Sequence, residues 1–323
     1  MQALVLVGGE GTRLRPLTET MPKPVLPLVD RPLLAFMVDW LDRHGVEEIV
    51  FASGFMSDTL REALGEGNAG GPRLRYLAEP APLGTAGAIK FAAEHLGERF
   101  LALNGDVLAD LDLTALVRAH EDSGATATLG LYRVDDPAAY GLVRRGEAGE
   151  VLEFVEKPGS GEGGGEINAG TYVLERSVLG LVPAGREVSI EREVFPRLVG
   201  RGLHGLALEG YWMDIGTPER YLQATWDILE GRVETDAEQS PDAVRVAPSA
   251  EVAATAAVGP RAVVAERCRI GERAEVRGSV LLVGCTIGDG ARVLDSILGP
   301  GVEVEEGVTL RDAVVGEGER VKT

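Results

Sequence analysis

Two kinds of segment alternate along the first 230 residues: short apolar runs, and longer stretches with apolar residues at helical spacing. The apolar runs, which are typical of strands buried on both faces, span residues 3–7, 48–52 and 100–104. The amphipathic stretches, which predict helices, span residues 32–44, 57–64 and 113–123. This β-α-β-α order predicts an α/β fold with a Rossmann-like, mostly parallel sheet and helices on both faces.

The helical spacing disappears from about residue 246, where apolar residues begin to recur every five or six positions. The first set recurs at Val246, Val252, Val258, Val264, Ile270 and Val276. The second set recurs at Ile287, Val293, Leu298, Val304, Leu310, Val315 and Val321. A hexapeptide period is typical of a parallel β-helix, in which each short strand forms one side of a coil. At about 18 residues per three-sided coil, this region predicts about four coils.

A polar, acidic segment with one proline, residues 234–242, separates these two patterns. Such a composition is typical of a linker, and a chain of 323 residues has room for about two domains. We therefore expect a first domain over residues 1–235 and a β-helix domain over residues 243–323. A glycine-rich segment over residues 159–165 predicts a surface loop inside the first domain.

Composition narrows the range of functions. Apolar residues make up 45% of the chain and charged residues 26%, as in folded globular proteins. The 32 basic and 51 acidic residues give a net charge of −19, which argues against a general nucleic-acid or anionic-membrane surface. No apolar run has the length of a membrane helix, and two cysteines do not make a disulfide framework. These features predict a cytoplasmic protein without nucleic-acid or membrane partners.

The first strand leads directly into a glycine-rich loop, with Gly8, Gly9, Gly11 and Thr12. Glycines after a parallel strand let backbone N–H groups approach a phosphate, at the sheet edge where ligands bind. Arg13, Arg15 and Lys23 follow and concentrate positive charge in an otherwise acidic chain. The pattern predicts a local anion site, and a surface turn with solvated arginines is the alternative.

This loop is the first of six motifs that follow one another along the chain. They are residues 7–18 with Pro22-Lys23-Pro24, residues 82–88, Asn104-Gly105-Asp106, Glu156-Lys157-Pro158, Asn168-Ala169-Gly170-Thr171-Tyr172 and Trp212-Met213-Asp214-Ile215-Gly216. The set, over about residues 1–230, resembles the signature of the sugar-1-phosphate nucleotidyltransferases, or nucleotide-sugar pyrophosphorylases. Within that family, Val7 and residues 189–196 and 212–216 are most similar to mannose-1-phosphate guanylyltransferases.

The resemblance implies that the hexapeptide tail is a left-handed β-helix. It also implies an enzyme in which a sugar-1-phosphate oxygen attacks the α-phosphorus of a nucleoside triphosphate and releases pyrophosphate. Mannose 1-phosphate and GTP, giving GDP-mannose, are the expected pair. A thymidylyl- or uridylyltransferase acting on glucose 1-phosphate is the first alternative, and a non-catalytic regulatory paralogue that binds nucleotide-sugar is the second.

The resemblance also implies roles for individual residues. Arg13, Lys23 and Asp106 are expected to be catalytic, with Arg13 and Lys23 on the β and γ phosphates. The nucleotide is expected to contact Leu6, Gly8, Gly9, Gly11, Thr12, Arg13, Glu79, Gly84, Thr85 and Ala86. The sugar phosphate is expected to contact Gly141, Glu156, Lys157, Asn168 and Gly170.

Asp106 and Asp214 are the expected ligands of Mg²⁺, a hard ion that suits carboxylate and phosphate oxygens. Each carboxylate has an ordinary structural alternative. Asp106 lies in an Asn-Gly-Asp sequence that is common in turns. Asp214 is a candidate helix cap before Pro218, and Glu156 is a candidate solvated side chain.

Glu79, five residues before Gly84, bears on the choice of base. A carboxylate only accepts hydrogen bonds, which suits the two adjacent donors of guanine. Thymine and uracil place one donor between two carbonyls. The thymidylyl- and uridylyltransferases of this family tend to hold glutamine at this position. Glu79 therefore favours GTP, unless its side chain faces solvent.

The remaining features suggest no second chemistry. The four histidines, His44, His95, His120 and His204, are expected to be structural or on the surface. Hexapeptide-repeat acyltransferases generally use a histidine base, and residues 246–323 contain none. Cys268 and Cys285 are expected to pack in the coil, and the β-helix is expected to support a homo-oligomer.

Overall fold

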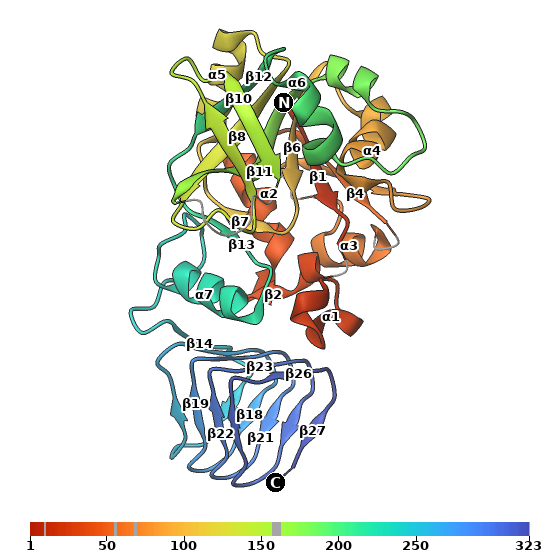
Figure 1. The fold of residues 1–323 in the computed structure, drawn as a ribbon. Coiled ribbons are helices and arrows are strands. Elements are labelled where there is room, and N and C mark those ends of the chain that lie inside the picture. The colour runs from red at the N-terminus through yellow and green to blue at the C-terminus, as the bar shows by residue number, and fades with distance from the viewer. Residues whose placement is uncertain (10, 55–56, 68–69, 157–162, 323) are drawn as a thin grey trace. The chain divides into compact units, whose positions relative to one another are not determined.

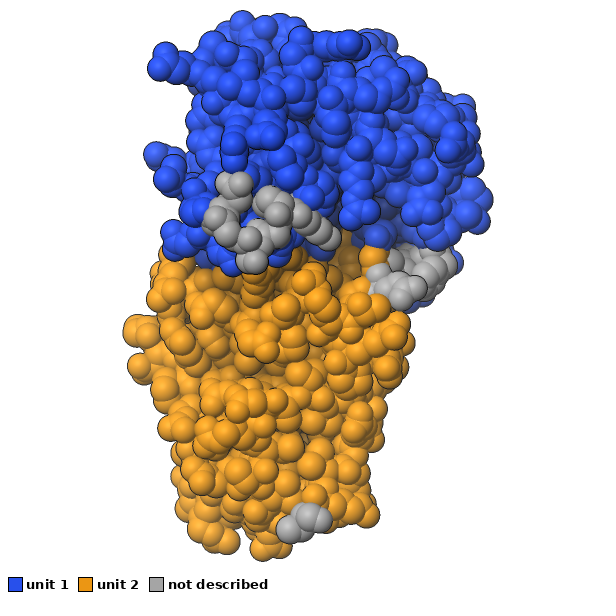
Figure 2. All heavy atoms as spheres, viewed as in Figure 1, with its two compact units in different colours: residues 1–8, 37–212 blue, residues 9–36, 213–323 orange. Residues whose placement is uncertain are grey.

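The computed structural model describes the chain except residues 10, 55–56, 68–69, 157–162 and 323. It divides into two compact units, shown in blue and orange in Figure 2. The first unit comprises residues 1–8 and 37–212, and the second comprises residues 9–36 and 213–323. This division cuts across the expected boundary near residue 240, so the domain limits of 1–235 and 243–323 stay a prediction.

The first unit is built on a nine-stranded sheet with the order β10-β9-β11-β6-β1-β4-β5, to which β8 and β12 add beyond β11. Its strands are β1 (Gln2–Val7), β4 (Glu48–Ser53), β5 (Arg73–Ala78), β6 (Arg99–Asn104), β8 (Ala127–Val134), β9 (Gly141–Arg145), β10 (Val151–Glu156), β11 (Gly165–Glu175) and β12 (Leu203–Ala207). Leu4, Val50 and Phe100 from the apolar runs are fully buried, which confirms strands covered on both faces.

This sheet contains both parallel and antiparallel pairs, and β12 pairs in parallel with β8. β1 pairs in parallel with β4 and β6, and β4 pairs in parallel with β5, as the sequence predicts. β11 pairs antiparallel with β6, β8 and β9, and β10 pairs antiparallel with β9. The α/β prediction is confirmed, and the later strands make the sheet more mixed than the early β-α-β-α order suggested.

Three helices begin and end close to the predicted limits: α2 (Leu33–Arg43), α3 (Ser57–Leu64) and α5 (Leu113–Ser123) (Figure 1). Two further helices, α4 (Gly84–Phe91) and α6 (Phe195–Leu198), are not among the predicted elements. Asp112 caps α5 by accepting the N–H of Ala115, and Gly124 ends it in the left-handed conformation. The chain also has two short strands, β7 (Val107–Ala109) and β13 (Trp212–Asp214).

The second unit joins the glycine-rich loop to a C-terminal coil. Its elements before the coil are α1 (Leu17–Thr20), β2 (Pro27–Leu28), β3 (Arg31–Pro32) and α7 (Pro218–Leu229). Thr217 caps α7 by accepting the N–H of Arg220, and Pro218 occupies the first helical position. The buried hydroxyl of Tyr221 on α7 donates to the carbonyl of Pro27, so the helix packs on the β2 turn.

Residues 244–321 form the coil, which is the blue stack in Figure 1. The first side holds β14 (Val244–Val246), β17 (Ala262–Val264), β20 (Ser279–Leu281), β23 (Ile297–Leu298) and β26 (Val314–Val315). The second side holds β15 (Glu251–Val252), β18 (Arg269–Ile270), β21 (Thr286–Ile287), β24 (Glu303–Val304) and β27 (Arg320–Val321). The third side holds β16 (Ala257–Val258), β19 (Glu275–Arg277), β22 (Arg292–Leu294) and β25 (Thr309–Arg311).

All pairs within these three sheets are parallel, so the coil is the parallel β-helix that the hexapeptide period predicts and is consistent with a left-handed one. Two sides carry five strands and one carries four, which slightly exceeds the expected four coils. Cys268 and Cys285 are buried in its core, where the thiols donate to the carbonyls of Leu282 and Gly299. Across the described residues, every helix is too short or too polar to cross a bilayer.

Candidate functional site

The carboxyl ends of β1 and β6 place three of the predicted residues at one edge of the sheet in the first unit. β1 and β6 are parallel neighbours, with Leu6 opposite Asn104. The N–H of Gly105 donates to the carbonyl of Leu6 at 2.9 Å, and a β-carbon on Gly105 would lie 2.8 Å from that oxygen. Glycine therefore lets the turn approach β1. Leu6 lies near the carboxyl end of β1, and Gly8 and the half-buried Asp106 follow the ends of β1 and β6.

The glycine-rich loop in the second unit folds against α1 and Lys23. Gly11 has a φ of 58°, and its carbonyl accepts the hydroxyl of Thr18 at 2.8 Å. A β-carbon on Gly11 would lie 3.1 Å from Thr18 Cγ2 and 3.2 Å from Lys23 Cβ. The loop then continues into a 3-10 turn over Thr12–Leu14, so Gly11 sets the backbone course that leads to Arg13.

Cationic side chains gather around Asp214 in the second unit. Lys23 is only 7% exposed, and its Nζ lies 3.6 Å from Asp214 Oδ1. Arg220 Nη1 lies 3.2 Å from Asp214 Oδ2. A β-carbon on Gly216 would lie 2.5 Å from Nη2 of Arg13, so the Arg13 guanidinium fills the space that glycine leaves. Three cations beside one carboxylate make this cluster net positive, as an anion site requires.

The interpretation of Asp214 as a helix cap is wrong. Thr217, not Asp214, provides the capping oxygen of α7, and Asp214 ends β13 instead. Its carboxylate is engaged with Lys23 and Arg220.

Glu79 follows β5 in the first unit and is half-buried, so it does not point fully into solvent. Burial raises the pKa of its carboxyl group, while a hydrogen bond from the Leu83 N–H acts to lower it. Since Leu83 immediately precedes α4, the Glu79 side chain helps to shape the loop that leads into that helix.

The first turn of α4 packs closely on residues 186–191. Gly84 has a φ of 66°, and a β-carbon on it would lie 2.7 Å from the Val188 carbonyl oxygen. Ala86 is buried, and its N–H donates to that same oxygen at 2.9 Å. The Thr85 hydroxyl donates to Glu191. Ala86 therefore lies in the packed interior of this turn, with its N–H used within the protein.

The predicted sugar-phosphate residues that the structure describes come together in the first unit. A β-carbon on Gly141 would lie 2.9 Å from Glu156 Oε2 and 3.5 Å from Asn168 Cβ. Gly141 pairs with Glu156 across β9 and β10, and Asn168 lies on the neighbouring strand β11. Lys157, which belongs to the same predicted group, lies outside the described residues.

Gly170, the fifth residue, connects this group to the end of β6. It has a φ of 70°, and a β-carbon on it would lie 2.7 Å from Nδ2 of Asn104. Asn104 ends β6, two residues before Asp106. The residues predicted to bind the sugar phosphate therefore lie next to the strand end that carries Asp106, within one unit.

Two residues without a predicted role belong to the same region. The Tyr172 hydroxyl accepts a hydrogen bond from Asn168, and Glu191 accepts one from Thr85. Residues 168–172 and 189–196 were both among the motifs that carry the resemblance, so the signal was present. The contact between β11 and the segment after residue 188 could not be predicted from the sequence alone.

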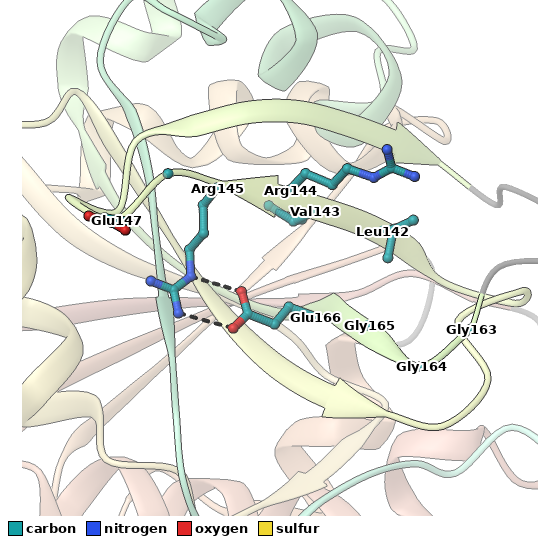
Figure 3. Close-up of a pocket in the computed structure, with 10 residues that line it drawn as sticks. Leu142, Val143, Arg144, Arg145, Glu147, Gly163, Gly164, Gly165 and Glu166 are labelled. Atoms are coloured by element: carbon teal, nitrogen blue, oxygen red, sulfur yellow. Dashed lines mark hydrogen bonds and ion pairs between the residues drawn. The ribbon is translucent and has the colours of Figure 1, made fainter.

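A separate hollow of about 490 Å³ lies between β9 and the start of β11 (Figure 3). Arg145 and Glu166 line it and are joined by hydrogen bonds of 2.8 and 3.0 Å. Glu166 raises the pKa of Arg145, so this guanidinium is already neutralised by a neighbour. None of the predicted site residues lines the hollow, and we do not assign it to the site.

Carboxylates are the side chains of the site that could bind a metal ion. Within the described parts of the chain, no three His, Cys, Asp or Glu side chains form a metal-binding group. The expected ligands, Asp106 and Asp214, offer carboxylate oxygens, which are the donors that Mg²⁺ prefers, so the chemistry of these side chains fits the expected ion.

Comparisons with known proteins cover both parts of the chain. Residues 2–231 match the nucleotidyl transferase family model, and residues 241–323 match the model of the GMPPB C-terminal domain. A mannose-1-phosphate guanylyltransferase from Mycobacterium tuberculosis is 40% identical over 235 residues, which are 72% of this chain and 65% of that protein. A mannose-1-phosphate guanylyltransferase catalytic subunit beta from Xenopus tropicalis is 40% identical over 228 residues, which are 69% of this chain and 63% of that protein. The match thus spans about two thirds of the length of these relatives.

Solved structures agree with the sequence matches. HddC from Yersinia pseudotuberculosis superimposes with a TM-score of 0.62 at 29% identity, over 70% of this chain and 99% of that one. HddC in complex with GMP-PN superimposes with a TM-score of 0.61 at 28% identity, over the same shares of the two chains. The family model covers more than half of the chain and contains every predicted site residue. The chain therefore belongs to the nucleotidyl transferase family.

Proposed function

We propose that this protein transfers GMP from GTP to mannose 1-phosphate, forming GDP-mannose and releasing pyrophosphate. The observation that carries the proposal is the 40% identity to mannose-1-phosphate guanylyltransferases over most of the nucleotidyl transferase segment. The complex of HddC with GMP-PN supports a guanine nucleotide as the donor.

The chemistry needs positioning and charge rather than a general base. The attacking oxygen belongs to a phosphate that is already anionic at neutral pH, so no proton has to be removed. The barrier comes from bringing two anions together in line, and cations that suppress their repulsion lower it.

In the proposed reaction, Arg13 and Lys23 neutralise the β and γ phosphates and the pyrophosphate that leaves. The low exposure of Lys23 supports this role, because a charge held out of water acts more strongly on its neighbours. The rest of the proposed nucleotide site consists of the strand-end and loop residues of β1 and the residues around Glu79 and α4.

Asp106 and Asp214 are the proposed holders of Mg²⁺, the divalent metal that supplies charge neutralisation to the triphosphate when bound. Because Asp214 also lies beside Lys23 and Arg220, its carboxylate keeps these two cations close to the proposed phosphate position. Asp106 depends on the Asn104–Asp106 turn for its place at the sheet edge.

Gly141, Glu156, Asn168 and Gly170 form the proposed sugar-phosphate site, together with Lys157 on the phosphate. Glycine at position 141 leaves room beside the Glu156 carboxylate, which suits hydroxyl groups of a sugar as hydrogen-bond donors. The proposal further places the enzyme in the cytoplasm as a homo-oligomer that assembles through its β-helix.

The test is a matrix of GTP, dTTP and UTP against mannose 1-phosphate and glucose 1-phosphate with Mg²⁺, scored by product mass and pyrophosphate release. GTP with mannose 1-phosphate is expected to turn over fastest. Faster formation of dTDP-glucose or UDP-glucose would instead support the thymidylyl- or uridylyltransferase. No product from any pair would support the regulatory paralogue.

A further inference from the structure

Residues 189–196 form a motif that the proposed reaction leaves without a role. Ile190–Val194 is a π-helix, and α6 follows it directly. Ser189 Oγ accepts the N–H of Arg192 at 3.2 Å, and the Ser189 N–H donates to Glu193 Oε1 at 3.0 Å. These two bonds cap the π-helix. Such helices are rare and are frequently found at functional sites.

Glu191 on this π-helix holds the first turn of α4. Its Oε2 accepts the hydroxyl of Thr85 at 2.8 Å and the hydroxyl of Ser189 at 2.8 Å. The Thr85 oxygen in turn accepts the N–H of Ile190 at 2.8 Å. One carboxylate oxygen therefore joins α4, on the proposed nucleotide side, to the π-helix.

The other oxygen of Glu191 faces the proposed sugar-phosphate site. The Tyr172 hydroxyl donates to Glu191 Oε1 at 3.5 Å and accepts from Asn168 Nδ2 at 2.9 Å. Asn168 Oδ1 accepts the N–H of Gly170 at 3.0 Å. Both ends of the Asn168 amide are therefore held, which fixes its orientation.

The Tyr172 ring is held as firmly as its hydroxyl. It is fully buried, and it packs edge-on against Phe195 of α6 with ring centroids 5.0 Å apart. Burial and the nearby Glu191 carboxylate raise the pKa of Tyr172 well above its ordinary value. The hydroxyl therefore stays protonated and can donate a hydrogen bond to Glu191.

We propose that Glu191 is a positioning residue for the sugar 1-phosphate, acting through Tyr172 on the side-chain amide of Asn168. The remaining N–H and lone pair of that amide then meet the sugar hydroxyls in one orientation only. Through Thr85, the same carboxylate also fixes the position of the Asn168 amide relative to the first turn of α4. The inference rests on the proposed function, because it explains how the proposed site is held.

The experiment compares the full-length chain with Glu191→Gln and Tyr172→Phe, using GTP, mannose 1-phosphate and Mg²⁺. Tyr172→Phe removes the link between Glu191 and Asn168 and keeps the ring that packs on Phe195. Glutamine at 191 offers one acceptor where the carboxylate offers two. Both changes are expected to raise the KM for mannose 1-phosphate about tenfold, as loss of a buried hydrogen bond to a charged group does. The KM for GTP is expected to change less than about twofold with Tyr172→Phe.

Glu193→Gln is the matched control. Glu193 lies on the same π-helix and is exposed, and its carboxylate caps Ser189 rather than facing Tyr172. The KM of the Glu193→Gln variant for mannose 1-phosphate is expected to equal that of the unaltered chain. The double change Glu191→Gln with Tyr172→Phe is expected to be no worse than the worse single change, because both act through one chain of hydrogen bonds.

The outcomes separate this inference from the proposed function. An unchanged KM for mannose 1-phosphate in Tyr172→Phe overturns the inference, and so does an equal rise in Glu193→Gln. A merely structural role would lower the melting temperature and leave both KM values alone. If Glu191→Gln does not fold, Tyr172→Phe decides the matter by itself. No turnover by the unaltered chain contradicts the proposed function instead.

Discussion

At the scale of single residues, the proposed chemistry depends most on Lys23. A buried lysine is costly unless a partner compensates its charge, and Asp214 at 3.6 Å is such a partner. The pair leaves the cluster positive because Arg13 and Arg220 lie beside the same carboxylate. The negative charge of a triphosphate is therefore expected to be favourable beside this cluster.

Lys23→Met keeps most of the apolar stem of the side chain and removes its charge. We expect kcat/KM to fall by about 10²–10³, the usual effect of removing one group that stabilises charge in the transition state. Steady-state pyrophosphate release measures the fall, and a melting curve checks the fold. Lys322→Ala, at an exposed position near the C-terminus, is the control and should keep the full rate. A parental rate in Lys23→Met would contradict the assigned role.

Glu79→Gln tests the choice of base. Glutamine can still accept the Leu83 N–H that the carboxyl group accepts, so the loop before α4 is expected to persist. It offers guanine one acceptor fewer, and the preference for GTP over UTP and dTTP should fall about tenfold. Catalytic efficiencies with the three nucleotides measure this, with the exposed Glu94→Gln as the control. An unchanged ranking and ratio would show that Glu79 does not read the base.

At the scale of elements, the approach of α4 to Val188 requires a glycine. Gly84→Ala places a β-carbon 2.7 Å from a backbone oxygen, at a positive φ. Gly45→Ala is the matched control, because Gly45 also has a positive φ but has open space around it. We expect Gly45→Ala to cost about 1–2 kcal/mol of unfolding free energy, and Gly84→Ala to cost about 1–3 kcal/mol more. Urea denaturation compares them, and equal losses would argue against the close packing.

Elements built from local patterns were predictable. The helix over 113–123 and the strands over 3–7 and 100–104 follow from apolar spacing, because burial of one face or of both is a local property of the sequence. The antiparallel pairing of β11 was not predictable from such patterns, because it depends on contacts between distant segments. The same reason hid the place of Glu191 beside Thr85, 106 residues away.

His120 is a second case in which a residue's burial could be predicted but its distant partner could not. His120 is buried, with Nδ1 2.8 Å from the Thr128 hydroxyl and Nε2 3.1 Å from Glu175, which confirms a structural role. Helical spacing could place His120 on the inner face of α5. It could not name Glu175, which lies on β11 and belongs to the strand whose pairing the sequence left open.

At the scale of the whole molecule, the β-helix belongs to the same compact unit as α7 and the glycine-rich loop from residue 9 onward. Arg261 on the coil and Glu230 after α7 form an ion pair at 3.0 Å, and Arg245 pairs with Asp30 at 2.8 Å. A β-carbon on Gly316 in the last coil would lie 3.2 Å from Pro16. The coil thus contacts the segment that carries the phosphate-binding residues of the proposal.

The β-helix is also the proposed assembly element, and its first coil is where a second copy is expected to bind. In the described chain, β14 and β15 each pair with one strand only, that of the next coil. Val246 and Val252 on these strands are 40% and 39% exposed, so this end of the coil presents apolar side chains. Val252→Lys should therefore reduce the mass per particle in light scattering, as should truncation after Ser240. Leu152→Lys, at an exposed apolar position on β10, is the control. A truncated chain that keeps the full-length oligomeric state would show that assembly lies elsewhere.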